Sequence, residues 1–320
     1  MPQVSIDVIA RESGVSASTV SRVFNRRPYV KDVLRHRVLL VAQRLGYNPP
    51  VMVRRTTISI VSGSSDVGNN SYEASMLGSF FSAASQIGFN VELVSLRDLE
   101  QVYLNFSQAV IAMIYNEKSA DCLRRLVGVP VVTINYQTKC CHYVCTDHFG
   151  GAYQGTEHLL AHGHRCIGVL LAPYADNMSW GEEARLAGCR QALAAHHLEL
   201  PPERILYGTL PQLSQVSEMV RISAPSALLV CGENLLLPVY HQLVTSGFRI
   251  PEDISLVSYF NSSVTPYLLP EPTCLVQDLA RLSRLTMESI RNLLTEDGAK
   301  IELMLDNGFI DGKSVRHLVD

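Results

Sequence analysis

The sequence predicts an α/β protein in which a small all-α head precedes two doubly wound parallel-sheet lobes. The first 48 residues carry three short helical patterns punctuated by glycines. From residue 58 onward, short apolar runs alternate with amphipathic helices, as in sheets built from strand–helix–strand units. Positive charge is concentrated at the N-terminal end: residues 1–55 hold ten Lys or Arg and three Asp or Glu, a net charge of +7. The remainder holds 17 basic and 27 acidic residues, a net charge of -10.

The first two helices of the head are marked by their ends. Ser5 can cap a helix over 6–13, and Gly14 can end that helix because glycine adopts the left-handed conformation without strain. Ser16 can then cap a second helix over about 17–24. Both helices have one apolar face, formed by Ile6, Ile9 and Ala10 in the first and by Val20, Val23 and Phe24 in the second.

A third helix begins near Lys31 and ends at Gly46. Its apolar residues recur at helical spacing and are expected to complete the core of the head: Val33, Leu34, Val38, Val41, Ala42 and Leu45. Two short helices joined by a tight glycine turn, with a third helix behind them, form the helix-turn-helix plan. A basic head of this kind favours a polyanionic partner, since Lys and Arg contacts to phosphates release counterions.

A longer signature runs through the head. It reads SIDVIARESGVS from Ser5, TVSRVFN from Thr19 and RLGYNP from Arg44. This order of residues resembles the head of the LacI/GalR family of bacterial transcription regulators, and it is far more specific than a short motif. The resemblance implies that the second helix reads operator DNA in the major groove.

By that resemblance, the base-reading residues of the second helix are Ala17, Ser18 and Arg22. Arg22 can bind a guanine edge through two hydrogen bonds, whereas Ala17 offers only a methyl contact. Phosphate contacts would set the register of the head on the duplex rather than read its sequence. The residues expected to hold phosphates are Ser16, Thr19, Ser21 and Asn25, and Ser5, Tyr29 and Met52 complete the expected DNA contacts.

The linker between head and core departs from the family pattern. Relatives usually carry a short helix here, whose leucine wedges into the minor groove. In this chain only residues 50–57 intervene, about six fewer than the family norm. Pro50 can open one helical turn, and Met52 is the nearest candidate for the wedging side chain.

The core from Ile58 onward has seven apolar runs that predict buried strands: 58–61, 91–94, 109–114, 129–134, 166–171, 227–230 and 254–257. Helical stretches lie near 73–87, 119–127, 150–161, 182–196, 214–223, 235–246 and 279–294. This is too much alternation for a single sheet, so we expect two lobes with a cleft between them. Ligands of such sheets bind at the carboxyl ends of the strands.

The family resemblance continues along the core, in VPVV from Val129, GHRCI from Gly163, RLAG from Arg185 and IPEDIS from Ile250. It implies a two-lobed core like that of type I periplasmic binding proteins. The chain then divides into a head over 1–48, a shortened hinge over 49–57 and an effector-binding and dimerisation core over 58–320. The N-lobe is expected to hold about 58–148 plus 278–304, and the C-lobe about 149–277 plus 305–320.

The resemblance also implies partners. A two-fold homodimer would place two recognition helices about 34 Å apart, which matches a pseudo-palindromic operator in double-stranded DNA. A small-molecule effector would bind in the cleft. By position, the effector contacts are Asn69, Tyr72, Tyr136, Asp147, Arg185, Glu233 and Phe260.

Two departures from the family pattern bear on the effector. Arg185, within RLAG, would be the main ligand-binding arginine, with an ion pair between the lobes as the structural alternative. Gly232-Glu233 replaces the usual Asn-Asp, and Phe260 stands where many relatives have an acid that grips sugar hydroxyls. Exchanging a carboxylate acceptor for an aromatic face disfavours an ordinary free hexose and favours a flatter or differently charged metabolite.

Other chemistries find little support in the sequence. Residues 63–68 have the glycine spacing of a phosphate-binding loop but lack its Lys and Ser/Thr. Residues 140–148 hold three cysteines and two histidines without a second spaced pair, which favours a structural loop with buried thiols over a metal site. No nucleophile elbow or acid–base set is present, so neither an enzyme nor a cofactor is expected.

The sequence thus predicts a DNA-binding transcription regulator, a repressor, whose core binds a sugar-like or related effector. No apolar run is long enough to span a membrane and no signal peptide is evident, so we expect no membrane partner and a cytoplasmic protein. One alternative is a DNA-binding regulator whose degenerate cleft acts without a ligand. Another is a solute-binding receptor with a vestigial head, which the intact second helix opposes.

Overall fold

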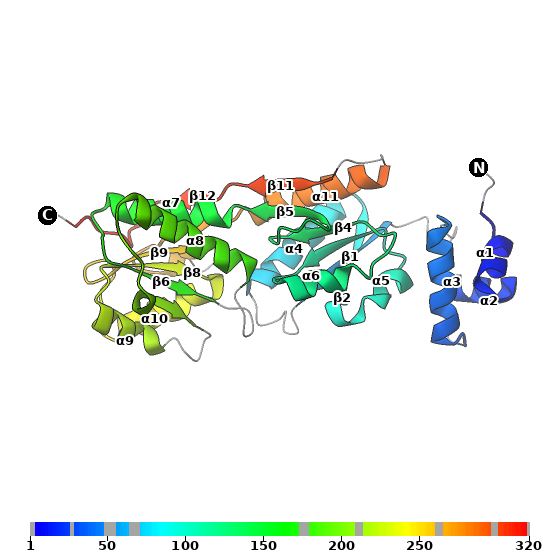
Figure 1. The fold of residues 1–320 in the computed structure, drawn as a ribbon, viewed down its shortest axis with the longest axis horizontal. Helices are drawn as coiled ribbons and strands as arrows, with labels where there is room; N and C mark the ends of the chain where they lie inside the picture. The colour runs from blue at the N-terminus through cyan, green and yellow to red at the C-terminus, as the bar shows by residue number, and fades with distance from the viewer. Residues whose placement is uncertain are drawn as a thin grey trace.

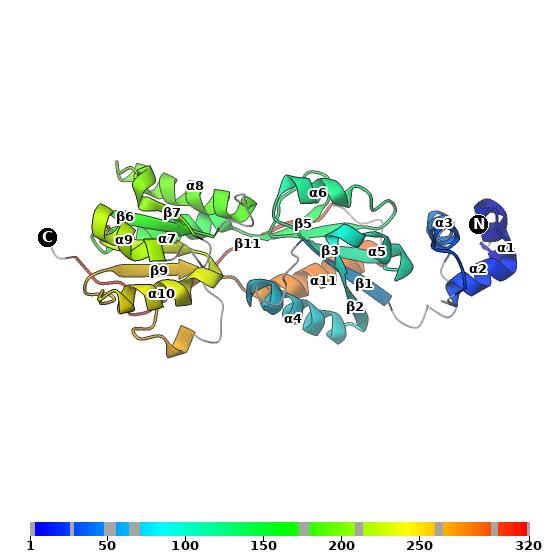
Figure 2. The same cartoon turned by 90° about the horizontal axis from the view of Figure 1, so that it is seen from below.

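The computed structural model describes residues 4–25, 29–47, 56–63, 71–172, 179–208, 214–259, 265–295 and 300–318. These residues form a three-helix head and two α/β lobes that follow one another in a row (Figure 1). Each lobe is built on a largely parallel sheet with helices on both faces, which is also evident in the view from below (Figure 2). The predicted fold class is therefore confirmed.

The head consists of α1 (Ile6–Ser13), α2 (Ala17–Phe24) and α3 (Asp32–Arg44). Its predicted caps are present. The Ser5 hydroxyl accepts from Val8 N at 3.4 Å, the Ser16 hydroxyl accepts from Thr19 N at 3.2 Å, and Gly14 has φ 67°. The head's buried core contains Ile9, Ala10, Val20, Val23, Phe24, Val30, Val38, Leu39, Val41 and Ala42.

One residue expected in the core of the head lies outside it. Val33 is 72% exposed, because it lies in the first turn of α3, before the stretch of that helix that faces α1 and α2. Leu39, which was not expected there, is 3% exposed and belongs to the buried stripe.

The N-lobe is built on a six-stranded parallel sheet in the order β11-β5-β4-β3-β1-β2. Its strands are β1 (Thr56–Ser62), β2 (Phe89–Ser95), β3 (Ala109–Met113), β4 (Val131–Ile134), β5 (His142–Thr146) and β11 (Glu302–Leu305). One face packs on α4 (Ser71–Gln86) and α11 (Leu279–Thr295), and the other on α5 (Glu100–Leu104) and α6 (Glu117–Leu123). A 3-10 turn, η2 (Leu96–Asp98), precedes α5.

The C-lobe sheet has the order β12-β10-β9-β8-β6-β7, with β12 antiparallel to β10. Its strands are β6 (Ile167–Leu171), β7 (Ile205–Tyr207), β8 (Ala227–Cys231), β9 (Ser255–Tyr259), β10 (Thr273–Val276) and β12 (Gly308–Ile310). The helices α7 (His148–Ala161) and α8 (Trp180–Ala195) cover one face, and α9 (Ser214–Ser223) and α10 (Leu236–Thr245) cover the other. The 3-10 turns are η3 (Pro202–Arg204), η5 (Glu233–Leu235) and η6 (Thr265–Tyr267).

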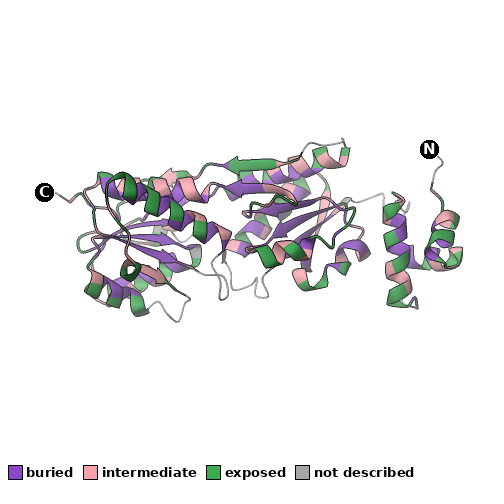
Figure 3. Ribbon diagram, viewed as in Figure 1, coloured by how far each residue is buried: buried purple, intermediate pink, exposed green. Residues whose placement is uncertain are grey.

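Burial follows this layering closely. Both sheets have buried central strands, and their helices expose only the face that points away from the sheet (Figure 3). All five residues of β3, β6, β8 and β9 are buried, and β3, β6 and β8 are apolar throughout instead of alternating, whereas β9 also buries two serines. Such continuous apolar runs are what made them recognisable in the sequence.

The chain passes between the lobes three times. It crosses from β5 to α7 at Asp147, from β10 to α11 at residues 277–278, and from β11 to β12 at residues 306–307. The first and third crossings are joined by hydrogen bonds: Asp147 N donates to Leu305 O at 2.8 Å, and Asn307 Nδ2 donates to Asp147 O at 2.6 Å. Parallel crossings of this kind let two lobes rotate about a hinge without separating.

Five strands were absent from the sequence-based expectation, namely β5, β7, β10, β11 and β12. Each is three to five residues long, and β7, β11 and β12 lie at or next to the edge of a sheet with exposed or half-buried residues. Within the described part of the chain, no helix is long and apolar enough to cross a membrane.

A close approach between α7 and α8 generates a stability prediction. A Cβ added at Gly188 would lie 2.2 Å from Phe149 O and 3.1 Å from Tyr153 N, which are backbone atoms that cannot move aside easily. Gly188→Ala should therefore lower the free energy of unfolding by about 1–3 kcal/mol. Thermal unfolding followed by circular dichroism measures the effect.

The matched control is Gly78→Ala in α4. No atom lies within 4 Å of a Cβ built at Gly78, so alanine should stabilise that helix by about 0.5–1 kcal/mol through its higher helix propensity. Equal melting temperatures for the two variants would contradict the close packing of α7 against α8.

Candidate DNA-binding head and effector cleft

The N-terminus of α2 gathers three hydroxyl groups. The Ser16 Oγ lies 2.9 Å from the Ser18 Oγ and 2.9 Å from the Thr19 Oγ1, and it also caps the helix. Ser16 and Ser18 are exposed and Thr19 is half-buried. Free backbone N–H groups at a helix N-terminus attract anions, so this group of hydroxyls is suited to phosphate oxygens.

The expected reading face of α2 is exposed. Ser18 and Arg22 lie four residues apart on one side of the helix, both exposed, and Ala17 between the cap and this face is half-buried. No ion pair involves Arg22 within the described residues, whereas Arg44 pairs with Glu12 at 3.5 Å. An unpaired guanidinium on the outer face of a short helix is free to bind a base edge.

The remaining residues expected to contact DNA differ in their hydrogen bonds and exposure. Asn25 Nδ2 donates to Ser21 O at 2.8 Å, so that amide helps to end α2. Ser5 caps α1 but stays exposed, and Tyr29 is 94% exposed. Met52, expected in the hinge, lies outside the described residues.

Arg185 is the buried charge of the C-lobe. It is 8% exposed, and its Nη1 donates to Cys231 O at 3.0 Å and lies 3.5 Å from Glu182 Oε1. Its guanidinium carbon lies 4.5 Å from the centroid of the Tyr259 ring. All these partners belong to the C-lobe, so the ion pair of Arg185 joins residues of one helix, not the two lobes.

His148 is a further hydrogen-bond partner of Arg185. Arg185 Nη2 lies 3.2 Å from His148 Nδ1, and burial, followed by the charge of Arg185, lowers the pKa of His148 well below its usual value. The imidazole is therefore neutral and accepts the hydrogen bond. Within the described part of the chain, Arg185 Nε has no hydrogen-bond partner. A buried donor without a partner is unfavourable unless a ligand or water satisfies it.

Glu182 is held by the start of α8. The Ser179 hydroxyl caps α8 by accepting from Glu182 N at 3.3 Å and donates to Glu182 Oε2, a capping box in the sequence Ser-Trp-Gly-Glu. Burial raises the pKa of Glu182, while Arg185 and Ser179 act in the opposite direction. Glu182 was not among the residues predicted from the sequence, although a Ser three residues before a Glu is the spacing of a capping box.

The N-lobe carries a hydrogen-bonded triad where it meets the C-lobe. Asn135 Nδ2 donates to Tyr72 and, at 3.1 Å, to Gln277 Oε1, and the Tyr72 hydroxyl donates to the same Gln277 oxygen at 3.3 Å. Asn135 has φ 50°, and its Oδ1 accepts from Thr146 N at 2.7 Å. The triad links α4, the segment after β4 and the second crossing. A shift of any one of these segments would therefore strain or break its hydrogen bonds to the other two.

A buried carboxyl group lies next to this triad. Glu73 is fully buried in the first turn of α4, where it accepts hydrogen bonds from the Tyr115 hydroxyl and, at 3.4 Å, from the Ser62 hydroxyl. Burial raises the pKa of Glu73, and these two hydrogen bonds lower it. From the sequence alone it was indistinguishable from an ordinary acid at a helix N-terminus.

The lobes touch at Trp180. Its backbone N–H, in the C-lobe, donates to Tyr115 O of the N-lobe at 3.2 Å, and its indole packs against the N-lobe's apolar cluster around Val61 and Ile114. The His148 ring lies 5.7 Å from the indole ring. Opening the lobes would break these contacts, so the one tryptophan of the chain is a natural reporter of lobe closure.

Several of the residues expected to contact the effector instead pack in a core, cap a helix or lie outside the described residues. Tyr136 is 9% exposed, packs in the N-lobe cluster, and burial raises its pKa. The Asp147 carboxylate accepts from Gly150 N at 2.8 Å and caps α7 at the first crossing. Glu233 begins η5. Asn69, Phe260 and the side chain of Glu233 lie outside the described residues.

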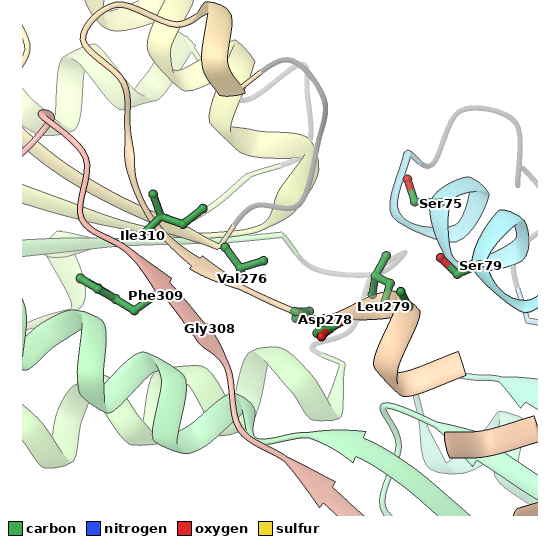
Figure 4. Close-up of a pocket in the computed structure, with 10 residues that line it drawn as sticks. Ser75, Ser79, Val276, Asp278, Leu279, Gly308, Phe309 and Ile310 are labelled. Atoms are coloured by element: carbon green, nitrogen blue, oxygen red, sulfur yellow. The ribbon is translucent and has the colours of Figure 1, made fainter. Parts of the chain in front are cut away.

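A pocket of about 560 Å³ lies beside the second crossing (Figure 4). Ser75 and Ser79 of α4 line it from the N-lobe, and Phe309 and Ile310 of β12 line it from the C-lobe, with Asp278 at the start of α11 between them. Rotation of the lobes about the crossings would change the size of this pocket.

The cysteine-rich stretch differs from the loop expected there. Residues 142–146 form β5, Cys140 is exposed with its Sγ 3.4 Å from Arg124 Nη2, and only Cys145 is buried. Burial raises the pKa of Cys145 to about 12. In the described part of the chain, no three His, Cys, Asp or Glu side chains converge as a metal site would require.

Comparison with known proteins places both parts of the chain. Residues 5–50 match the family described as bacterial regulatory proteins, lacI family, and residues 156–315 match the periplasmic binding protein-like domain. The chain belongs to the lacI family of regulators. This confirms the family resemblance and identifies the head as the DNA-binding part of a transcription regulator.

Relatives align along nearly the whole chain. The HTH-type transcriptional repressor PurR of Haemophilus influenzae (strain PittEE) is 24% identical over 309 residues, covering 91% of each chain. The probable HTH-type transcriptional repressor ExuR of Bacillus subtilis (strain 168) is 24% identical over 334 residues, covering 98% of this chain and 99% of the relative.

Solved structures of regulators share the fold. The transcriptional regulator CelR–cellobiose complex has a TM-score of 0.71 and 24% identity, covering 98% of this chain and 100% of CelR. The Lac repressor dimer bound to operator and the anti-inducer ONPF has a TM-score of 0.73 and 21% identity, covering 98% and 99% of the two chains.

The buried ion pair of the lacI-family core generates a pH-dependent prediction. Replacing Arg185 by a neutral residue leaves the Glu182 carboxylate buried without its cation. This should lower the free energy of unfolding by about 3–5 kcal/mol at neutral pH. A carboxyl group whose pKa is raised by folding weakens stability as the pH rises above its ordinary value, which is 4.5 for Glu182. Arg185→Leu should therefore be more destabilised at pH 8 than at pH 5, as measured by thermal unfolding.

The double variant Arg185→Leu/Glu182→Gln is the control, because it leaves no buried charge. It should recover most of the lost stability and lose the added pH dependence. An Arg185→Leu variant equally destabilised at both pH values would show that Glu182 and Arg185 are not energetically linked.

Proposed function

We propose that this chain is a transcription repressor that binds a pseudo-palindromic operator as a homodimer, with an effector in the cleft that modulates binding. The observation that carries the proposal is the exposed second helix, whose hydroxyl-rich N-terminus and unpaired Arg22 lie in a basic N-terminal segment, residues 1–55, of net charge +7. Relatives along the whole chain are named as repressors, which supports this function. Because its partner is DNA, its proposed place of action is the bacterial cytoplasm.

In this proposal the head divides its contacts by type. Ser16, Thr19, Ser21 and Asn25 hold phosphates and set the register, with Ser5, Tyr29 and Met52 at the margins of the contact. Arg22, with Ala17 and Ser18, reads base edges in the major groove. The proposed domains are the head over 1–48, the hinge over 49–57 and the core over 58–320.

The proposed effector site lies between Arg185 and Tyr259 on one side and Tyr72 with Asn135 on the other. Asn69, Tyr136, Asp147, Glu233 and Phe260 complete the proposed contacts. An arginine with an unpartnered Nε over a tyrosine ring suits a ligand with a flat ring and an acceptor oxygen. Such a sugar-like or related metabolite would favour the closed arrangement of the lobes that Trp180 and Tyr115 make.

A second candidate is a regulator whose core works without a ligand. One observation favours it: both Nη atoms of Arg185 already have partners inside the C-lobe, at Glu182, Cys231 and His148. In that case the buried charge is satisfied by the protein, and the cleft holds the lobes closed by itself.

The reading role of α2 is tested by Arg22→Ala. The wild-type chain should enrich an inverted repeat from a pool of randomised duplexes, and the variant should lose preference at the guanine that Arg22 contacts. The expected loss on the selected operator is about 1–3 kcal/mol, a factor of roughly 5–150 in Kd. Filter binding or electrophoretic mobility gives the value.

The control is Arg44→Ala at the C-terminal end of α3, which removes a head charge of the same type that pairs with Glu12. It should leave sequence preference unchanged and reduce binding only through the electrostatic contribution, which weakens steeply with salt. Identical sequence preference in wild type and Arg22→Ala would remove Arg22 from the reading face.

The effector is tested by thermal shift against sugars, sugar acids, sugar phosphates and nucleosides. A ligand that binds only the folded chain at one hundred times its Kd should stabilise it by about 2.7 kcal/mol and raise the melting temperature. The shift should disappear in Tyr72→Phe or Asn135→Ala, which alter the cleft outside the Arg185 ion pair. A library without any hit would favour the ligand-independent regulator.

A further inference from the structure

The head does not stand apart from the core. Its apolar cluster extends to two residues of the N-lobe: Leu104, the last residue of α5, and Phe106, in the turn between α5 and β3. In both views α3 faces the side of the N-lobe that carries α5 (Figures 1 and 2), and the two helices are in contact. The core of the head is therefore completed by the lobe beside it.

Phe106 is the centre of this contact. Its ring centroid lies 5.8 Å from that of Phe24 at the end of α2, and the Phe24 ring stacks on Tyr47 at 5.4 Å. Phe106 has φ 53°, a left-handed backbone that is unfavourable for any residue with a Cβ. The strained backbone carries a large apolar ring onto the head, a position in which a glycine would otherwise be expected.

A second ring contact lies alongside. Tyr103 meets the His36 ring edge-on at a centroid distance of 6.3 Å. Its hydroxyl accepts from Val127 N at 2.8 Å and lies within hydrogen-bond distance of two backbone carbonyl oxygens, of Arg125 and Val127. The His36 Nδ1 is buried without a hydrogen-bond partner in the described part of the chain.

The surface that receives the head is built by the N-lobe itself. The Ser107 and Ser59 hydroxyls lie 2.6 Å apart and are buried, and Gln108 N donates to Thr57 O at 2.9 Å. Phe106 N donates to Tyr103 O at 3.1 Å, which closes the turn. These bonds fix Phe106 to β1 independently of the head, so the surface is pre-organised for docking.

The fit between the two parts is incomplete. A cavity of about 360 Å³ separates Leu39, Gln43 and Tyr47 of the head from Pro130 and Leu293 of the lobe. Interfaces that leave such voids lose contact energy relative to a packed interior, so the docked state can be left at modest cost. In sequence, eight residues separate Tyr47 from Thr56, which keeps the head close to this surface after release.

We propose that the head docks on the N-lobe of its own chain through Phe106 and Tyr103, and that this contact sets the direction in which α2 faces DNA. The inference rests on the proposed function as a DNA-binding regulator. Phe24 and Tyr47 face the lobe while Ser18 and Arg22 stay exposed, so docking leaves the reading face open. Rotation of the N-lobe then turns the head directly, and the short linker need not carry the motion.

Phe106→Gly tests the docking in the full-length chain. Glycine removes the ring and relieves the left-handed backbone, so the N-lobe keeps its stability. Hydrogen exchange measured by mass spectrometry should become several-fold faster in the segment from His36 to Tyr47. Affinity for the duplex selected by the wild type should fall about tenfold, because two loosely held heads engage two half-sites with a lower effective concentration.

The matched control is His197→Gly, which relieves the same backbone conformation (φ 57°) at an exposed position of the C-lobe. It should change neither exchange in the head nor operator affinity. Unchanged exchange from His36 to Tyr47 in Phe106→Gly would refute the docking, and faster exchange with unchanged operator affinity would refute its role in DNA binding. A wild type that selects no duplex would refute the proposed function instead, while the exchange comparison would still report on docking.

Discussion

The three crossings of the chain between the lobes are the constraint on which the rest of the structure depends. They place the carboxyl ends of β5 and β10 at the junction, so the residues that follow these strands gather where the lobes meet. Because α11 follows a C-lobe strand yet packs on the N-lobe, neither lobe is complete without the other's chain. Asp147 and Asn307 tie two crossings together, which gives the lobes a common axis instead of independent linkers.

The cleft and the head are connected through the N-lobe alone. Tyr72 and Glu73 at the start of α4 face the junction, and the turn carrying Phe106 lies at the opposite end of the same sheet. The strands between them are buried and densely packed, so we expect the N-lobe to transmit a rotation as a rigid body. In that arrangement, closure of the lobes would change the orientation of the head.

The sequence was informative wherever local pattern determines structure. The head was predictable from its caps and its glycine turn, and the long apolar strands such as β3 and β8 from their composition. Short strands such as β11, with three exposed residues out of four, were not, because they exist only by pairing with a distant neighbour. The same holds for the cleft: Arg185 was singled out, but its partner Glu182 and the lobe contact of Trp180 depend on how separate elements meet. The contact of Phe106 with the head could not be predicted, because no sequence pattern indicates that a phenylalanine adopts the left-handed backbone conformation.

We expect the head and the effector site to be thermodynamically linked, and the fluorescence of Trp180 measures that link most directly. Linkage is reciprocal, so if lobe closure alters DNA affinity, then binding of DNA must alter lobe closure. Trp180 is the single tryptophan and lies at the contact between the lobes. It begins α8, which is remote from α2 (Figure 1). Saturating operator duplex should change the tryptophan emission maximum or intensity, whereas an equal amount of a scrambled duplex should change it less. Emission that stays the same while the operator is fully bound would show that the core does not sense the head.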